Sequence, residues 1–537
     1  MISQRRFTAL QSGLVFVISL LAGGMISVHF GKELNWDLAN YHYYNAFAFL
    51  HQRWLVDYWP TSFVHAYFTP TLDFLTYFLI NYLPPKAATF VLGAIHGLNI
   101  WLLYCIARLL LETLPGIRYA SFFAVTVAVI GIYGPTALTG IGSFQHDDLV
   151  SLFVLGFVYL QVKCWLIYAD TRKLPAFLFS LAGVMLGVGI GGKLTAAVFA
   201  VGAGAALLLL PLSWRLRFQY ASWFGLTVLM GILLSSGYWM LHLWQQYHNP
   251  FFPLLNGFFQ APDFPAYNWK DPRFLPHGIL QTLFYPFYFS LDGRTGDSDF
   301  RDFRFAIAYV LFILCAFTFN RKRVSHPEKN VFAIRWLLLF FLFSYVVWQA
   351  YFSIMRYVVA LEMLAPLIIC LLLYRVIRDP SWRFSITAAV FIFLTVMMVP
   401  TYMVRAPWYL GNYFNVLLPK WVQEDKSQAL VLVPYPAYAF YTNPRPQAYL
   451  VPFLPAQWRF AGVPFLHQDY TVPAKVYSFV SAAKPETLFL LASPEYMGNM
   501  QKIAGTMGFA HTVQCGKITN DRQAMTHEDL LICKLKR

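Results

Sequence analysis

The sequence predicts a polytopic α-helical membrane protein with a small α/β domain at its C-terminal end. Three observations lead to this fold class: apolar residues make up 58% of the chain, charged residues make up only 12%, and apolar runs long enough to cross a bilayer recur between residues 7 and 403. Soluble proteins carry about 25% charged residues. A soluble chain of 537 residues with so little charge could not cover its own surface with polar groups.

About eleven apolar runs are expected to be transmembrane helices. The first, near residues 7–30, follows Arg5 and Arg6 and exceeds the roughly 7–15 residues of a signal-peptide core. An uncleaved first span is therefore favoured over a cleaved signal peptide. The other runs centre on residues 88–111, 119–138, 148–168, 176–192, 194–212, 219–241, 303–319, 335–352, 358–377 and 383–403.

The basic residues between these runs fall in every second loop. They are Arg118, Arg172-Lys173, Arg215 with Arg217, the group from Arg321 to Arg335, and Arg375 and Arg378 with Arg383. Loops of this kind stay on the cytoplasmic side, beside anionic headgroups. The alternation predicts a bacterial inner-membrane protein with a cytoplasmic N-terminus and a periplasmic C-terminus. It also accounts for the formal charge of +15 without a nucleic-acid partner, because the basic residues do not gather on one face.

Two of the opposite, outer loops are long. They span residues 31–87 and 242–302 and are rich in Trp, Tyr, Phe, Pro and Asp. Within the first loop, the pattern predicts an amphipathic helix over Leu38–Gln52 and a second helical stretch over Ser62–Tyr82, which contains Pro70. Helices of this kind lie along a membrane surface.

The membrane domain is expected to span residues 1–405, and residues 406–537 to form a periplasmic α/β domain. The expected strands of that domain are 429–433, 487–492, 511–516 and 529–535, with a helix at 494–507. Cys515 and Cys533 fall in two strands that would pair antiparallel. They form either a disulfide in an oxidising compartment or two buried thiols on opposite strand faces. No cysteine spacing in the sequence is typical of a zinc or iron–sulfur site.

A carboxylate that follows the first span is the first candidate for catalysis. If a helix begins there, four polar side chains share one face at spacing i, i+3, i+4 and i+7: Asp37, Asn40, Tyr41 and Tyr44. A carboxylate, an amide and two phenols would line a site for a sugar or a phosphate. Asp37 also suits the N-cap of that helix, and the two roles are compatible.

The segment Gln145-His146-Asp147-Asp148 precedes the fourth span on the same outer side. Adjacent carboxylates beside a histidine can hold a divalent cation, such as Mg²⁺ or Mn²⁺, or a cationic group. The alternative is that Asp147 begins a helix, whose dipole favours a carboxylate at that end. Any metal site is expected at Asp147 and Asp148.

Two basic residues stand in short outer loops, where the positive-inside rule does not explain them. Lys193 follows Gly191-Gly192, whose backbone lets a phosphate approach; a lysine that snorkels towards water is the alternative. Arg356, which precedes Tyr357, suits a phosphate through bidentate hydrogen bonds. Its alternative is an ion pair with Glu362 or an aspartate that braces two helices.

The membrane part resembles the GT-C superfamily of membrane glycosyltransferases. The resemblance is carried by the carboxylate after the first span, the acidic loop before the fourth, and three motifs: Gly192-Lys193-Leu194-Thr195, Asn249-Pro250-Phe251-Phe252-Pro253 and Arg356-Tyr357. It covers about residues 1–405 and points to no individual family. It implies a polyprenyl-phosphate sugar donor and, usually, inversion at the anomeric carbon.

The resemblance also implies roles for single residues. Asp37 is implied as the general base on the acceptor hydroxyl, and Asp147 or Asp148 as a second acidic position. Lys193 and Arg356 are implied to bind the donor phosphate, which is the leaving group. Some relatives use a divalent metal and others do not, so the metal stays open. The expected substrate-binding residues are Asn40, Tyr41, Tyr44, His146, Asp147, Asp148, Lys193, Arg356 and Tyr357.

The sequence thus predicts a glycosyltransferase that moves a sugar from a polyprenyl-phosphate donor to a hydroxyl of a cell-envelope glycan, lipid or protein. The chain has neither a dinucleotide-binding glycine motif nor a Walker motif, so no nucleotide is expected. One alternative is a transporter or flippase of lipid-linked glycans, which should show inverted repeats. Another is an O-antigen-type ligase or polymerase, which shares the donor chemistry but transfers a whole chain.

The alternation of basic clusters predicts that residues 31–87, 242–302 and the tail beyond 405 all lie outside the cytoplasm. Single cysteines introduced at Ser62, Ser298 and Ser478 should react with a membrane-impermeant thiol reagent in intact spheroplasts. Reaction only after the membrane has been disrupted would reverse the predicted topology.

Overall fold

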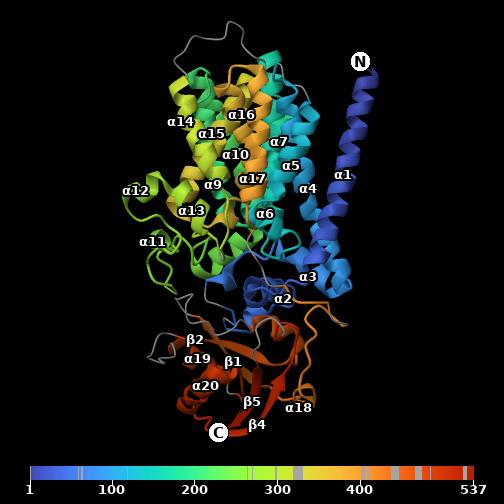
Figure 1. The fold of residues 1–537 in the computed structure, drawn as a ribbon. Helices are drawn as coiled ribbons and strands as arrows, with labels where there is room; N and C mark the ends of the chain where they lie inside the picture. The colour runs from blue at the N-terminus through green and yellow to red at the C-terminus, as the bar shows by residue number, and fades with distance from the viewer. Residues whose placement is uncertain are drawn as a thin grey trace. The chain divides into compact units, whose positions relative to one another are not determined.

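The computed structural model describes residues 2–537 except 59, 62–63, 116, 118, 263, 269, 297–298, 319–329, 401–404, 409–410, 437–446, 466–473, 484, 486 and 524–528. Arg118, the basic residues of 321–329, Ser62 and Ser298 therefore lie outside the described residues. The chain divides into two compact units (Figure 1). The helical unit comprises residues 1–27, 92–250 and 254–403, and the sheet unit comprises residues 28–91, 251–253 and 404–537.

The expected spans are all helices in the structure. Among the described residues, seven helices are long and apolar enough to cross a membrane, and four more are apolar but shorter. In chain order the eleven are α1 (Ile2–Phe30), α4 (Pro85–Leu111), α5 (Ala120–Ile132), α7 (Asp147–Thr171), α8 (Ala176–Gly192), α9 (Ala197–Leu208), α10 (Trp214–Tyr247), α14 (Arg304–Thr318), α15 (Val331–Tyr351), α16 (Val359–Val376) and α17 (Pro380–Met397). The predicted polytopic helical fold is confirmed.

Short helices link these spans in the helical unit. They are α6 (Pro135–Gly140), the 3₁₀ turns η4 (Leu194–Ala196) and η5 (Met355–Val358), and the helices of the second long loop, α11 (Asn256–Phe259), α12 (Gly278–Leu283) and α13 (Tyr285–Asp292). The 3₁₀ turns η4 and η5 directly precede α9 and α16, so they place loop side chains at the ends of apolar helices.

Small residues let α8 and α10 pack closely. A Cβ on Gly187 would overlap the carbonyl oxygen of Val228, and a Cβ on Gly231 would overlap that of Val184. Close backbone approach through small residues is a common way for helices to associate in a membrane, where burial of apolar surface supplies no driving force. Because α8 ends at Gly192, this contact also determines where Lys193 lies.

A buried ionic cluster joins α6, α14 and α16. The Arg304 guanidinium lies 2.7 Å from Asp302 Oδ2 and 2.9 Å from Glu362 Oε1, and all three side chains are fully buried. Glu362 also accepts hydrogen bonds from the Thr136 hydroxyl and, at 3.0 Å, from the Thr136 backbone N–H. The alternative that Glu362 pairs with Arg356 is therefore wrong, since Glu362 is bound by Arg304.

The sheet unit contains the expected C-terminal α/β fold. Its described strands are β1 (Leu430–Pro436), β2 (Arg459–Phe465), β3 (Leu488–Ala492), β4 (His511–Ile518) and β5 (Leu530–Lys536), in the order β2-β1-β3-β5-β4. The first three are parallel to one another, and β5 is antiparallel to both β3 and β4. Three helices accompany them: α18 (Lys420–Gln423), α19 (Ala474–Ala483) and α20 (Pro494–Thr506).

The sequence missed β2 because Gly462 and Pro464 interrupt its apolar pattern, and both are poor strand residues. Proline is tolerated in an edge strand, and β2 is the last strand in the sheet order on its side. Tyr58, from the first long loop, continues the pairing there: its N–H donates to Phe460 O at 2.7 Å, and its carbonyl accepts from Gly462 N at 2.6 Å.

The disulfide alternative for Cys515 and Cys533 is confirmed. The two residues face each other in the register of β4 and β5 and are bonded, with a Cα–Cα distance of 4.1 Å. The bond closes a loop across a sequence separation of 18. Loop closure of this size stabilises a domain by about 3 kcal/mol in the chain-entropy model.

The first long loop contributes η1 (Leu38–His42, a π-helical turn), α2 (Tyr43–Leu50) and α3 (Asp73–Tyr82). The first two match the helix expected over 38–52. The third is shorter than the expected 62–82 because it begins only after Pro70. Proline cannot donate a helical hydrogen bond, and it disfavours helical dihedrals at the residue before it.

Replacing Gly187 with leucine should force α8 and α10 apart and destabilise the helical unit. Overpacking typically costs about 1–3 kcal/mol, which would appear as a lower midpoint of thermal unfolding in detergent. Gly225→Leu on α10 is the matched control, since a Cβ at Gly225 meets nothing within 4 Å. Equal midpoints for the two variants would contradict the close-packing interpretation.

Candidate functional site

The acidic residue that begins α7 is placed by a tight turn. His146 has φ of +67°, in the left-handed region, and α7 begins at the next residue, Asp147. The helix dipole favours a carboxylate at this end. Asp147 therefore begins a helix, as the structural alternative in the sequence analysis expected. The surroundings of the carboxylate then decide what else it can do.

Lys193 meets Asp147 at this point. Lys193 follows the last residue of α8, and its ammonium donates to Asp147 Oδ1 at 2.6 Å and to the Gln145 carbonyl at 2.9 Å. Both side chains are largely but not fully buried, with 16% and 9% of their surface exposed. A lysine bound in this way is directed into the protein, which is not the snorkelling alternative.

Arg356 adds a second positive charge from η5. Its Nη1 lies 3.7 Å from Asp147 Oδ2, an ion-pair distance longer than a hydrogen bond. The backbone around it is fixed, because Met355 N–H donates to Thr295 O at 2.8 Å and Trp348 Nε1 donates to Ile354 O at 2.7 Å. The sequence left open whether Arg356 pairs with Glu362 or with an aspartate, and the structure shows a pair with Asp147.

Tyr357 completes what we call the cationic cluster: Asp147, Lys193, Arg356 and Tyr357. Its ring centroid lies 5.4 Å from Lys193 Nζ and 5.3 Å from Arg356 Cζ, within range of a cation–π interaction. Two cations therefore converge on the carboxylate of Asp147, and cationic side chains of this kind can bind an anion.

The neighbouring Asp148 has different surroundings. Its carboxylate lies against Gly140 of α6, where a Cβ would overlap Oδ2, and its own carbonyl accepts from Asn99 Nδ2 at 2.9 Å. A Mg²⁺ or Mn²⁺ site needs several oxygen ligands that converge on one point. The Asp147 carboxylate accepts from the Lys193 ammonium and the Asp148 carboxylate lies beside Gly140, and a divalent cation at these two residues stays a prediction.

Asp37 lies in the sheet unit, inside a short helical segment. Its dihedral angles are helical, and it makes no side-chain capping bond within the described part of the chain. Asn35 caps instead, because its Oδ1 accepts from Leu38 N–H at 2.8 Å. Asp37 therefore does not make the N-cap hydrogen bond considered from the sequence, and the residue is 6% exposed.

The residues expected to share a face with Asp37 are all buried, but a π-helical turn over Leu38–His42 changes their spacing. The Tyr41 ring stacks on His65 at 4.7 Å between centroids. The Tyr44 hydroxyl donates to Asp57 Oδ2 at 2.9 Å. Burial first, and nearby Asp57 second, raise the pKa of Tyr44 well above its ordinary value, so this hydroxyl stays protonated. The fourth residue, Asn40, is 2% exposed.

Asp57 is part of the same packed region, and sequence reasoning missed it. Burial raises the pKa of its carboxyl, while the hydrogen bonds and charge of Arg53 act in the opposite direction. A second pair was also missed: His42 Nδ1 lies 2.6 Å from Asp73 Oδ1, with both side chains buried. A carboxylate in this position fixes the orientation and tautomer of an imidazole. The sequence feature that could have revealed both pairs, Arg53–Asp57 and His42–Asp73, is the presence of charged or polar residues within a loop rich in aromatic side chains.

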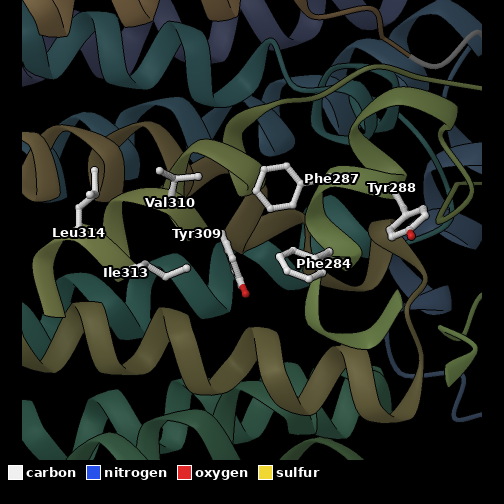
Figure 2. A pocket seen from close by; sticks show the side chains of 7 residues that line it. All are labelled: Phe284, Phe287, Tyr288, Tyr309, Val310, Ile313 and Leu314. Atoms are coloured by element: carbon white, nitrogen blue, oxygen red, sulfur yellow. The ribbon is translucent and has the colours of Figure 1, made fainter. Parts of the chain in front are cut away.

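An apolar pocket of about 600 Å³ opens between the second long loop, at α13, and α14. Figure 2 shows the rings of Phe284 and Phe287 beside Tyr309, with aliphatic side chains continuing along α14. Its lining residues are Phe284, Phe287, Tyr288, Tyr309, Val310, Ile313 and Leu314. The loop after α13 carries Thr295, whose carbonyl binds Met355 next to Arg356.

No protein-family model matches the chain, and no curated protein matches it. Among solved structures, the chain is similar to a crystal structure of ArnT from Cupriavidus metallidurans bound to undecaprenyl phosphate. The identity is 11% and the TM-score is 0.47, with 97% of each chain covered. We therefore argue function from the side chains of the cationic cluster and of the Asp37 segment.

Lys193→Ala and Arg356→Ala should each weaken the binding of a polyprenyl phosphate. A hydrogen bond to a charged group is worth about 1.5–3 kcal/mol, so each variant should raise the dissociation constant roughly 10- to 100-fold. Calorimetric titration of the protein in nanodiscs measures this. Arg108→Ala is the control, because it removes an arginine of the same unit that pairs with Glu112.

Asp147→Asn tests whether Asp147, Lys193 and Arg356 form a ligand site or only a structural brace. It removes the carboxylate that competes with a phosphate for Lys193 and Arg356, so binding of polyprenyl phosphate should be kept or strengthened. A loss of affinity as large as that of Lys193→Ala would show that the three side chains act only as a brace.

Proposed function

We propose that this protein is a membrane glycosyltransferase that moves a sugar from a polyprenyl-phosphate donor to an acceptor hydroxyl on the periplasmic face of a bacterial inner membrane. The observation that carries the proposal is the cationic cluster, in which Lys193 and Arg356 both pair with the carboxylate of Asp147. The acceptor would be a cell-envelope glycan, lipid or protein.

The charge of the cluster fits the donor. A sugar phosphodiester of a polyprenol carries a negative charge, and the cluster offers two cationic side chains, Lys193 and Arg356. Arginine and lysine form the strongest hydrogen bonds to phosphate oxygens, and partial burial strengthens them by lowering the local dielectric constant. The 16% and 19% exposure of Lys193 and Arg356 leaves the cations within reach of a ligand.

The same charges would act on the reaction. The acceptor oxygen attacks the anomeric carbon, the bond from that carbon to the phosphate oxygen breaks, and polyprenyl phosphate leaves with a second negative charge. Cations held in place before the reaction stabilise charge that develops on the leaving group. Lys193 and Arg356 are held by the carboxylate and by the backbone contacts of η5, so they need little reorganisation.

A polyprenyl chain also needs apolar surface. The pocket between Phe284, Phe287 and Tyr309 offers such surface in the same unit as the cationic cluster. The loop that follows α13 is bonded through Thr295 to Met355, one residue before Arg356. These contacts support a donor that is lipid-linked in preference to one that is soluble.

Asp37 is proposed as the general base that takes the acceptor proton. Its carboxylate is not used to cap its own helix, it is nearly buried, and the resemblance to GT-C enzymes implies this role at this position. One carboxylate that removes a proton while the phosphate departs on the other face of the sugar would invert the anomeric carbon.

The decisive experiment supplies purified protein in nanodiscs with polyprenyl-phosphate pentoses and hexoses and measures the release of free polyprenyl phosphate. Asp37→Asn should reduce transfer by about 10²-fold or more, because an amide cannot accept the proton. Donor binding and the unfolding midpoint should stay unchanged. The control is Asp529→Asn, which alters an exposed ion pair.

Two results would contradict the proposal in different ways. Near-normal turnover of Asp37→Asn would remove the base assignment but leave the enzyme class. Release from none of the donors, with lipid-linked glycans moved intact across the bilayer of proteoliposomes, would favour a transporter. Transfer of a whole glycan in place of one sugar would identify a ligase.

A further inference from the structure

Three consecutive residues that lead into the Asp37 helix are each bonded to the C-terminal tail. Lys32 and Ala406 exchange backbone hydrogen bonds of 2.9 and 2.8 Å. The Glu33 carbonyl accepts from the Tyr413 hydroxyl at 3.2 Å, and the Leu34 carbonyl accepts from Arg522 Nε at 3.1 Å. All of these residues belong to the sheet unit.

The strongest of these ties is a buried ion pair between Lys32 and Asp521. The Lys32 side chain is fully buried, and that of Asp521 is 7% exposed. Asp521 is held in turn by its own N–H, which donates to Phe414 O at 3.0 Å, and by Asn415 Nδ2, which donates to Oδ1 at 3.2 Å. A buried ammonium needs a counter-ion. If the contact with Asp521 were broken, the buried Lys32 ammonium would lose its paired charge.

The tail also holds the chain that follows Asp37. The Tyr43 ring packs on Phe414 at 4.7 Å between centroids. Asp57, which binds Tyr44, accepts from Phe460 N–H at 3.0 Å, while Arg53 donates to Trp458 O at 2.6 Å. Asp37 thus lies in a short helical segment that tail residues fasten on both sides.

We propose that the C-terminal domain is a positioning scaffold for Asp37, and that Lys32 and Asp521 are its main positioning residues. The inference rests on the proposed role of Asp37 as general base. A base has to lie within hydrogen-bond reach of the proton that it removes, and a displacement of about 1 Å can cost on the order of 100-fold in rate. The π-helical turn that follows Asp37 is only five residues long, and such turns are rare and often occur at functional sites.

The test compares Asp521→Asn with Asp521→Glu in the full-length protein. The amide variant should lower kcat about 10- to 100-fold and change the dissociation constant of undecaprenyl phosphate less than threefold, because Lys193 and Arg356 belong to the other unit. The glutamate variant keeps the charge and should recover most of the lost kcat. Asp529→Asn makes the same change of charge in an exposed pair of the same domain, 50% and 54% exposed, and should keep normal kcat.

A double-mutant cycle distinguishes positioning from general damage. In an Asp37→Asn background, Asp521→Asn should cause no further loss of rate, since the group that it positions is already absent. Additive losses, or equal losses of kcat and donor affinity, would overturn the inference. If Asp521→Asn does not fold, Tyr413→Phe keeps the ring but removes the hydroxyl that donates to the Glu33 carbonyl, and it should lower kcat with an unchanged unfolding midpoint.

The two proposals fail differently. If Asp37→Asn keeps its turnover, the base assignment fails and the positioning role fails with it. If Asp37→Asn is inactive while Asp521→Asn and Tyr413→Phe both keep normal kcat, the proposed function stands and the scaffold role of the C-terminal domain is wrong.

Discussion

A charge buried in this protein has to be paired, because an ion that leaves water loses several kilocalories per mole of hydration, and only an opposite charge with good hydrogen bonds replaces it. Charged residues are only 12% of the chain, so few are available. In the described residues, buried or nearly buried pairs form around Arg304, Lys193 and Lys32. Each joins segments far apart in the sequence and so ties together elements that apolar packing alone would leave free to slide.

These ion clusters differ in a way that separates structure from function. Arg304 is surrounded by two carboxylates, and all three side chains are closed off from solvent, which describes a brace. Around Lys193 the balance is reversed, with two cations on one carboxylate and part of each cation exposed. The exposed part of each cation is where a bound anion could make contact. The close packing of α8 on α10, possible only at glycines such as Gly187, brings Lys193 to this point.

Much of the candidate site was visible in the sequence, and its limits were specific. Lys193 and Arg356 stood out because they occur in loops predicted to lie outside the cytoplasm, where the positive-inside rule does not explain a basic residue. The structure pairs both of them with Asp147, and it pairs Glu362 with Arg304. These ion pairs depend on which helix ends lie next to each other, and no local sequence pattern encodes that. For the same reason the sequence offered Asp37 as an N-cap, although Asn35 is two residues away and makes that bond.

The sequence by itself determined the fold class, the apolar helices, most strands of the C-terminal sheet and the cysteines that can pair, because run length and alternation are local properties. The tertiary structure decided which ions meet and that the edge strand β2, with its glycine and proline, joins the sheet. It also decided that residues 28–91 pack in one unit with the C-terminal tail. These outcomes come from contacts such as that between Lys32 and Asp521, 489 residues apart. Their free energy exists only after the chain has brought distant segments together and removed water from between them.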